Sequence, residues 1–387
     1  MIAYNTEWLD NNKVQEQLEE TLNNNCITGE EMNAAATQYK TGFYTPNIFI
    51  RIGLHILTAV IIAFSCGLFG LVFLSSSSEA TFSILLIFFG IVCYAMLEVM
   101  VRTKNHYCSG VDDALLLYAA VFIISGMNVF GNMPAFGNAF LIMIFALYGF
   151  IRFTDRLMAF ITVVALLAFV FFILAEIGGI AKAIAPFVLM LVSAAVYFIS
   201  NLLTSKHECR YHHSCLTVCK VTALVSFYFS GNYFVVREAS NVFFDLQLKP
   251  TDSIPFAWLF WLFTISVPLV YIAWGIIKKD IVLIRTGLLL SIFIVLTVRF
   301  YYAVLPAETA MILAGVILIV IAYALGKLLK PSRAGFTALQ TAAHTDKTII
   351  QNLEAIVIAE TLSSGQPQQQ NRFGGGNFGG GGAGGDF

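Results

Sequence analysis

The chain has 387 residues, of which 58% are hydrophobic and only 12% are charged, and its formal net charge is −1. Average soluble domains carry about 25% charged residues, so this composition excludes an ordinary water-soluble globular protein. A net charge so close to zero gives no electrostatic reason for a polyanion partner, and we predict no binding of nucleic acid.

Residues 1–47 are predicted to form a cytoplasmic helical hairpin. Leu18 and Leu22 share one face of a first helix, which ends at the asparagine run 23–25. Thr28 and Glu31 have the spacing of a capping box, in which each side chain binds the other residue's amide, and they start a second helix. The hairpin is interpreted either as a solvated element packed on the membrane face or as a docking module for partner proteins.

Residues 48–330 are predicted to form an all-α, polytopic transmembrane helix bundle of about ten spans in the lipid bilayer. A helix needs about 20 mostly apolar residues to cross the hydrocarbon core. The third and fourth runs are short, and the segment around Pro134 is alternatively a re-entrant break. The runs cover residues 48–74, 80–101, 112–129, 135–151, 157–174, 181–204, 214–236, 254–277, 281–305 and 307–329.

The basic residues predict that both termini are cytoplasmic. Lys and Arg are retained on the cytoplasmic side of a membrane because they resist translocation. With ten spans and the N-terminus inside, only four of the 22 basic residues fall outside, which leaves 18 inside. The four outer residues are Lys182, Arg237, Lys249 and Arg299.

Asp112 and Asp113 lie at the start of the third predicted span. Acidic residues suit a helix N-terminus, where amides are unsatisfied and the partial charge is positive. An ion or proton site is the alternative, since paired acids close to a membrane can act as coupling groups.

A loop rich in His and Cys precedes the seventh predicted span. Imidazole and thiolate groups are suitable zinc ligands, although the Cys spacing here matches no common zinc finger. The alternatives are an ordinary basic juxtamembrane loop and lipid modification of its cysteines. The candidate ligands are His207, Cys209, His212 and Cys215.

A second candidate site lies at the predicted outer ends of the spans. Arg299 falls about two turns inside its span, where a charge is costly unless it is paired or hydrated. We therefore predict a polar pocket around Arg299 that is open to the outer face; the alternative is interfacial anchoring with one structural ion pair. The candidate ligand-binding residues are Arg299, Tyr302, Glu308, Asn128, Asn132, Asn232, Arg237 and Glu238.

The C-terminal part follows the last predicted span. Residues 331–362 carry apolar side chains at helical spacing and are predicted to form a cytoplasmic amphipathic helix, which lies on the membrane surface or pairs with the N-terminal hairpin. Residues 363–387, ending in GGGNFGGGGAGGDF, have few aliphatic side chains to bury and are predicted to be disordered.

Two features resemble known families. The hairpin with Ile27-Thr28-Gly29-Glu30-Glu31, directly followed by a many-span bundle, resembles a broad bacterial family of uncharacterised membrane proteins. The tail is similar to the glycine-rich C-termini of bacterial membrane proteins that carry a TPM domain. That domain's extracytoplasmic fold has no counterpart here, so no activity carries over. The resemblances imply a multi-pass protein of the bacterial inner membrane.

Motifs of known enzymes and nucleotide-binding proteins are not found in the sequence, and no catalytic residue or cofactor is predicted. The favoured hypothesis is a non-enzymatic scaffold or partner subunit whose cytoplasmic ends recruit other proteins. The alternative is a transporter or receptor for a small polar ligand in the outer pocket. A membrane enzyme that uses the outer residues has the least support.

Overall fold

The computed structural model shows an α-helical protein whose described part contains no β-strand; its single β-bridge joins Tyr44 to His106. Residues 1–328 form one compact unit. The structure describes residues 2–23, 26–73, 79–131, 133–178, 180–244 and 254–301, with scattered positions between 309 and 327.

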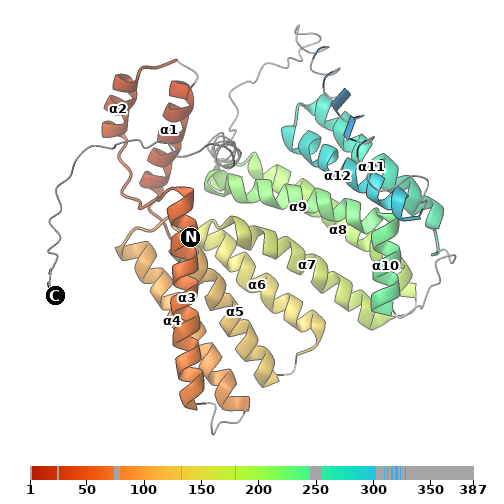
Figure 1. Cartoon of the computed structure of the whole chain (residues 1–387), viewed down its shortest axis with the longest axis horizontal. Helices are drawn as coiled ribbons and strands as arrows, with labels where there is room; N and C mark the ends of the chain where they lie inside the picture. The colour runs from red at the N-terminus through yellow and green to blue at the C-terminus, as the bar shows by residue number, and fades with distance from the viewer. Residues whose placement is uncertain are drawn as a thin grey trace, which may run out of the picture. The chain divides into compact units, whose positions relative to one another are not determined.

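Nine helices in the described ranges are long and apolar enough to cross a membrane, which confirms the predicted all-α polytopic bundle (Figure 1). The tenth predicted span, 307–329, and the segments 331–362 and 363–387 lie almost entirely outside the described residues. The helices are α3 (Ile48–Phe73), α4 (Glu79–Thr103), α5 (Val111–Gly131), α6 (Ala135–Phe153), α7 (Arg156–Ile177), α8 (Ile180–Thr204), α9 (His213–Gly231), α11 (Ala257–Lys278) and α12 (Ile281–Tyr301).

Two further helices form the predicted hairpin. Helix α1 spans Thr6–Asn23 and α2 spans Gly29–Gln38. The capping box is present as predicted, since the Thr28 hydroxyl accepts from the Glu31 amide and the Glu31 carboxylate accepts from the Thr28 amide. The hairpin belongs to the same compact unit as the spans, because Tyr4 and Leu9 are buried in one core with residues of α4, α5 and α6.

Neighbouring spans pack as antiparallel pairs, most closely α4 with α5, α6 with α7, α8 with α9, and α11 with α12. Gly126 shows why α4 and α5 approach so closely. A Cβ added there would lie 2.9 Å from the Ser83 carbonyl oxygen and 2.6 Å from the Ile87 side chain. Small residues at such crossings allow membrane helices to pack backbone against backbone.

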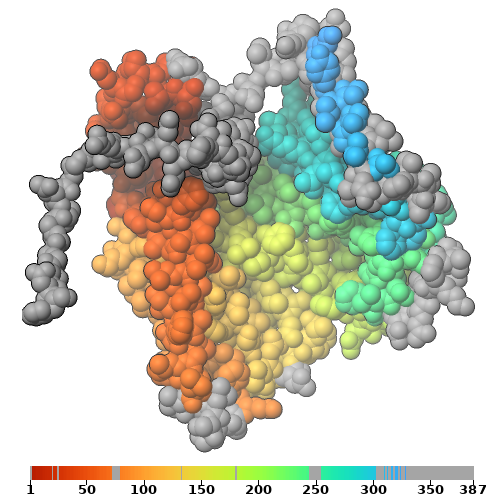
Figure 2. Space-filling view, in the orientation of Figure 1, coloured from red at the N-terminus to blue at the C-terminus, as the bar shows by residue number. Residues whose placement is uncertain are grey.

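Helix α3 packs differently from the other spans. It contacts mainly α5, and only 6% of its most apolar window is buried, against 22% or more in the other eight. Figure 2 shows α3 as a continuous column on the surface of the bundle, with apolar side chains such as Phe64, Leu68 and Leu71 exposed. Lipid chains can cover such a surface without cost, which water could not.

The seventh span ends earlier than its predicted range of 214–236. Helix α9 ends at Gly231, and Asn232 has an extended backbone with φ −77° and ψ 127°. The Asn232 side chain then accepts from the Val235 amide and starts a separate helix, α10 (Tyr233–Phe244). The 3₁₀ helix η2 (His207–His212) connects α8 to α9.

Candidate functional site

A polar cavity of about 650 Å³ lies where the N-terminal hairpin meets the spans. Its walls come from α1, from the first turns of α3, α5 and α7, and from the connections that precede them. We call it the hairpin cavity. The other end of the bundle, where α10 follows α9, is called the α10 end.

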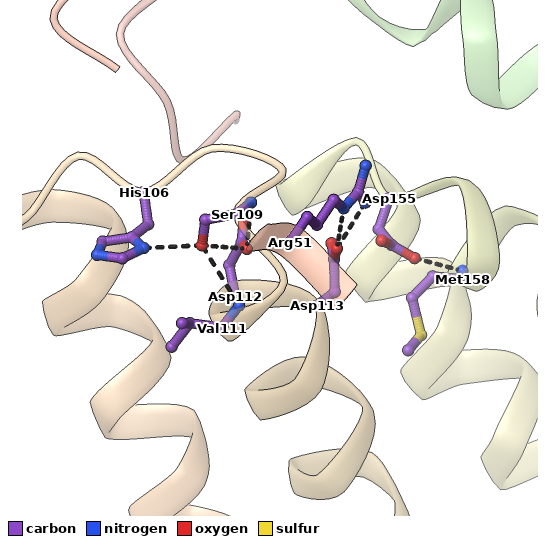
Figure 3. Close-up of polar contacts among 8 residues, drawn as sticks. All are labelled: Arg51, His106, Ser109, Val111, Asp112, Asp113, Asp155 and Met158. Carbon is purple, nitrogen blue, oxygen red and sulfur yellow. Dashed lines mark hydrogen bonds and ion pairs between the residues drawn. The ribbon is translucent and has the colours of Figure 1, made fainter. Parts of the chain in front are cut away.

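An ion pair between α3 and α5 forms part of the cavity wall (Figure 3). The Arg51 guanidinium donates through Nε and Nη2 to Oδ2 of Asp113, at 3.0 and 2.5 Å. Both bonds end on the same oxygen, which leaves Oδ1 of Asp113 for another partner. Gly110, with φ +90°, permits this approach of the two helices, since a Cβ there would overlap the Arg51 carbonyl oxygen.

Asp112 has a structural role at the start of α5. Its Oδ1 accepts from the amide and the hydroxyl of Ser109, both at 2.9 Å, and it is almost completely buried. The Ser109 hydroxyl also lies 2.7 Å from Nδ1 of His106. The contacts of Asp112 therefore agree with a structural role at the helix start. Asp113 instead forms an ion pair with Arg51.

Asp155 is the third aspartate of the cavity, and it precedes α7. Its carboxylate caps the helix by accepting from the Met158 amide at 2.7 Å. Burial, followed by the charges of Asp113 and Asp112, raises the pKa of Asp155 to about 6. Asp155 therefore holds a proton under mildly acidic conditions in which an ordinary aspartate is ionised.

Acidic groups outnumber basic groups around the cavity. Its guanidinium groups are those of Arg51 and Arg156, and Arg51 is already paired with Asp113. The imidazole of His55 also lines the cavity. Burial raises the pKa of the Cys108 thiol to about 12, so this group stays neutral at physiological pH. The acidic lining residues are Glu16, Glu19, Asp112, Asp113 and Asp155.

Aromatic side chains form another part of the wall. The Tyr4 ring meets Tyr107, Phe43 and Phe153 edge to face, with centroid distances of 4.9, 6.0 and 6.5 Å. Tyr4 is only 8% exposed, and burial raises the pKa of its hydroxyl well above the ordinary value. The Tyr4 hydroxyl therefore stays neutral at physiological pH.

Polar contacts hold the hairpin over the cavity. Arg210 of η2 donates to the Asp10 carboxylate at 2.7 Å, and the Tyr211 hydroxyl donates to the same oxygen at 2.9 Å. Lys13 donates to the Arg210 carbonyl oxygen at 2.7 Å. The Ala3 amide donates to the Arg152 carbonyl oxygen at 2.9 Å, so the chain before α1 is also attached to the bundle.

The predicted pocket around Arg299 is only partly assembled in the described residues. Asn232 is 1% exposed and donates to the Tyr228 hydroxyl and the Thr297 hydroxyl, each at 3.0 Å, so its amide is used within the protein. Asn128 lies on α5, which packs against α3, α4 and α6 rather than beside Asn232. Tyr302, Glu308 and Asn132 lie outside the described residues.

The charged members of that group also have contacts of their own. Arg237 is buried, with Nη1 3.4 Å from Oε1 of Glu238 and 3.4 Å from the Tyr301 hydroxyl. Its guanidinium carbon lies 5.4 Å from the centre of the Tyr301 ring. Arg299 is half-buried. The structure therefore joins Arg237 to Glu238 and Tyr301.

The four candidate metal ligands are not brought together. Nε2 of His212 lies 3.0 Å from the Ile151 carbonyl oxygen, and the Cys215 thiol donates to the Thr154 carbonyl oxygen at 3.0 Å. His207 lies against Arg210, and Cys209 is half-buried. In the described ranges, no group of three or more His, Cys, Asp or Glu side chains is placed to hold a metal ion.

Sequence reasoning identified Asp112 and Asp113 but not Arg51, Asp155 or Tyr4 as members of this site. The sequence carries one usable signal, because Asp155 stands just before a predicted span, as Asp112 and Asp113 stand at the start of theirs. Comparison with family models, curated proteins and solved structures gives no match, so the function has to be argued from these residues.

Proposed function

We propose that this chain is a multi-pass membrane protein that binds a small polar ligand in the hairpin cavity, as a receptor or a transporter. The observation that carries the proposal is a cavity of about 650 Å³ lined by charged side chains from four separate helices. Ligand sites typically have about 300–1,000 Å³ and a small number of convergent polar groups. In the outer-pocket hypothesis the ligand was placed at the α10 end, where Asn232 is already satisfied.

The orientation in the membrane is part of the proposal. The positive-inside distribution supports cytoplasmic termini and, for a bacterial inner-membrane protein, a hairpin cavity that opens toward the cytoplasm. A reporter enzyme fused after Phe387 tests this directly. Activity of a cytoplasm-specific reporter is expected, and activity of a periplasm-specific reporter would reverse the orientation.

Ligand binding is tested with a screen of small polar metabolites against the purified protein in detergent. A ligand of the cavity should raise the midpoint of thermal unfolding, because it binds only the folded state. Thr45→Trp adds bulk at the exposed rim of the cavity and should reduce this shift. Ser205→Trp is the matched control, since Ser205 is an exposed hydroxyl on the α8–η2 connection that does not line the cavity.

The outcomes of the screen separate the alternatives. A shift that Thr45→Trp weakens and Ser205→Trp leaves unchanged supports binding in the hairpin cavity. Equal shifts in both variants would place the ligand elsewhere, for example at the α10 end. The proposal would be withdrawn if no anionic, neutral or cationic compound in the screen stabilised the protein.

A scaffold is the second candidate function, and one observation favours it. Helix α2 has no buried residue and packs against α1 alone among the stronger helix contacts, so its surface is available to another protein. Glu30→Lys reverses an exposed charge on α2, and Glu7→Lys does the same on α1 as a control. A partner that copurifies with the unmodified protein should be lost only with Glu30→Lys. A protein that purifies alone under mild extraction argues against the scaffold.

A further inference from the structure

A second cluster of charged side chains lies where α4 and α6 end, and it takes no part in the hairpin cavity. Arg102 and Arg152 stand in the last turns of α4 and α6, and Glu98 lies one turn before Arg102. Both helices pack on α5, and the long side chains of these residues bridge from one helix to the other. We call Glu98, Arg102 and Arg152 the Glu98 cluster.

One carboxylate holds both guanidinium groups of the cluster. Oε1 of Glu98 accepts from Nε and Nη2 of Arg152, at 2.8 and 2.6 Å. Oε2 of Glu98 lies 2.8 Å from Nε of Arg102. The cluster therefore carries two positive charges and one negative charge. The ion pairs of Arg51 and of Arg210 each match one base with one acid, so they have no such excess.

Arg102 is the member of the cluster that faces outward. Its side chain is 65% exposed, whereas those of Glu98 and Arg152 are 17% and 20% exposed. Arg102 approaches the carboxylate through Nε, which leaves its two terminal nitrogens for an oxyanion outside the protein. A guanidinium group presents its N–H donors as a planar fork, which matches two oxygens of a phosphate.

Two tyrosines indicate the depth of the cluster in the membrane. The Tyr148 hydroxyl lies 2.6 Å from the Tyr94 hydroxyl, which donates to Oε1 of Glu98 at 2.8 Å. Tyr148 is 45% exposed on α6. Exposed tyrosines concentrate at the level of the lipid headgroups, and the last turns of membrane spans lie at the same level. The free donors of Arg102 are therefore at the depth of the lipid phosphates.

An apolar stripe continues from Arg102 along the exposed side of α4. Ile84, Phe88 and Ile91 are 62%, 54% and 57% exposed. Their spacing along the helix places them on the same face as Arg102. A positive charge at the end of an exposed apolar stripe matches a phospholipid, which has an anionic headgroup above its acyl chains. A soluble anion would leave the stripe without a role.

We propose that the Glu98 cluster binds the headgroup of an anionic phospholipid, with Arg102 donating to the phosphate and Glu98 holding both guanidinium groups in place. The inference goes beyond the proposed function and does not depend on a ligand in the hairpin cavity. The excess positive charge favours a headgroup whose phosphate is not compensated by an amine, as in phosphatidylglycerol. The alternative is that these arginines only orient the protein, in which case every basic span end attracts lipids equally.

Two lipids with the same acyl chains test the charge selectivity. The purified full-length protein in detergent is titrated with dioleoyl-phosphatidylglycerol, which is anionic, or with dioleoyl-phosphatidylcholine, which is zwitterionic. Native mass spectrometry gives the apparent dissociation constant of the first bound lipid, and thermal unfolding gives a second readout. Phosphatidylglycerol should bind more tightly and raise the unfolding midpoint further, because it binds the folded state. Equal affinity for the two lipids would overturn the inference.

A pair of matched variants tests the location. Arg102→Gln removes the outward charge and should weaken the first phosphatidylglycerol about fivefold, which is the effect of one basic residue at an anionic lipid surface. Binding of phosphatidylcholine should not change. Arg285→Gln is the control, because Arg285 is an exposed arginine near the start of α12, at the same predicted side of the membrane. Helix α12 packs most closely on α11 and α9, away from the Glu98 cluster.

Inorganic phosphate separates a free anion from a lipid headgroup. Sodium phosphate is compared with sodium chloride at equal ionic strength, and no difference in the unfolding midpoint is expected. If sodium phosphate stabilised the protein as much as phosphatidylglycerol and Arg102→Gln removed the effect, the ligand would be a soluble anion and the lipid assignment would be wrong.

The remaining outcomes also decide the case. An unchanged first phosphatidylglycerol in Arg102→Gln, or an equal loss in Arg285→Gln, would mean that the attraction is not localised at the Glu98 cluster, and the inference would be withdrawn. The comparison of the two lipids uses the unmodified protein and so does not depend on the folding of a variant. The metabolite screen reports on the hairpin cavity, so either proposal can fail while the other stands.

Discussion

Arg51 and Asp113 join the first turns of α3 and α5 through two hydrogen bonds that end on one carboxylate oxygen. Helix α3 has few other buried contacts, so this ion pair is a main attachment of its first turns to the bundle. The same ion pair forms part of the wall of the hairpin cavity.

Asp113→Asn should destabilise the protein because it leaves the half-buried Arg51 with a neutral partner. The two side chains are 37% and 20% exposed, so solvent screening limits the loss to about 1–2 kcal/mol. Unfolding in mixed SDS micelles measures it, and Arg51→Gln with Asp113→Asn should cost less than the sum of the single changes. Arg102→Gln is the control with a small expected effect, because Arg102 is 65% exposed and its partner Glu98 keeps its ion pair with Arg152.

The two roles of Asp155 can be separated by choice of substitution. Asp155→Ala removes both the ionisable group and the cap on the Met158 amide, and the loss of the cap should cost about 1 kcal/mol. Asp155→Asn keeps a capping oxygen and should cost less at neutral pH. Equal losses for both variants, measured by chemical unfolding at pH 7.5, would mean that the cap contributes little.

Stability should depend on pH through Asp155. Its pKa is about 6 in the folded protein and near 3.9 in an unfolded chain, so the folded state holds more protons between these values. The free energy of unfolding should therefore fall as pH rises from about 4 to about 6, by on the order of 1–3 kcal/mol, and then level off. Asp155→Asn should flatten this slope, and a slope that persists would assign it to other groups.

The contacts of α1 with η2 should keep the hairpin closed over the cavity. Asp10→Ala removes the acceptor shared by Arg210 and Tyr211, and hydrogen exchange in α1 should become faster. Exchange in the middle of α5 should stay unchanged, which separates local opening from global unfolding. Glu7→Ala, which changes an exposed side chain on the same helix, is expected to have little effect.

The close crossing of α4 and α5 predicts opposite effects for two glycine substitutions. Gly126→Val should destabilise the protein by about 2 kcal/mol or more, because its Cβ would overlap the Ser83 carbonyl oxygen. Gly67→Ala on α3 meets open space and should be neutral or slightly stabilising through helix propensity. Thermal unfolding of both variants in the same detergent provides the comparison. A loss with Gly67→Ala would indicate that another surface packs on α3.

The sequence by itself determined the class of fold, the approximate positions of the nine spans that the structure describes and the start of α2. These features depend on local composition: an apolar run too long for water needs a bilayer, and Thr28 and Glu31 are only three residues apart. The end of α9 at Gly231 was not predicted from the sequence, because the apolar pattern continues past Asn232, where the chain turns.

Only the tertiary structure decided which polar groups share a site. Arg51, Asp113 and Asp155 lie on three different helices, and no local pattern states which span ends meet in space. The same packing attaches Asn232 to Thr297 and separates Asn128 from both. Hydrophobicity selects which segments enter the membrane, whereas side-chain shape and hydrogen bonding between helices select their neighbours, and the chemistry of the cavity depends on that second choice.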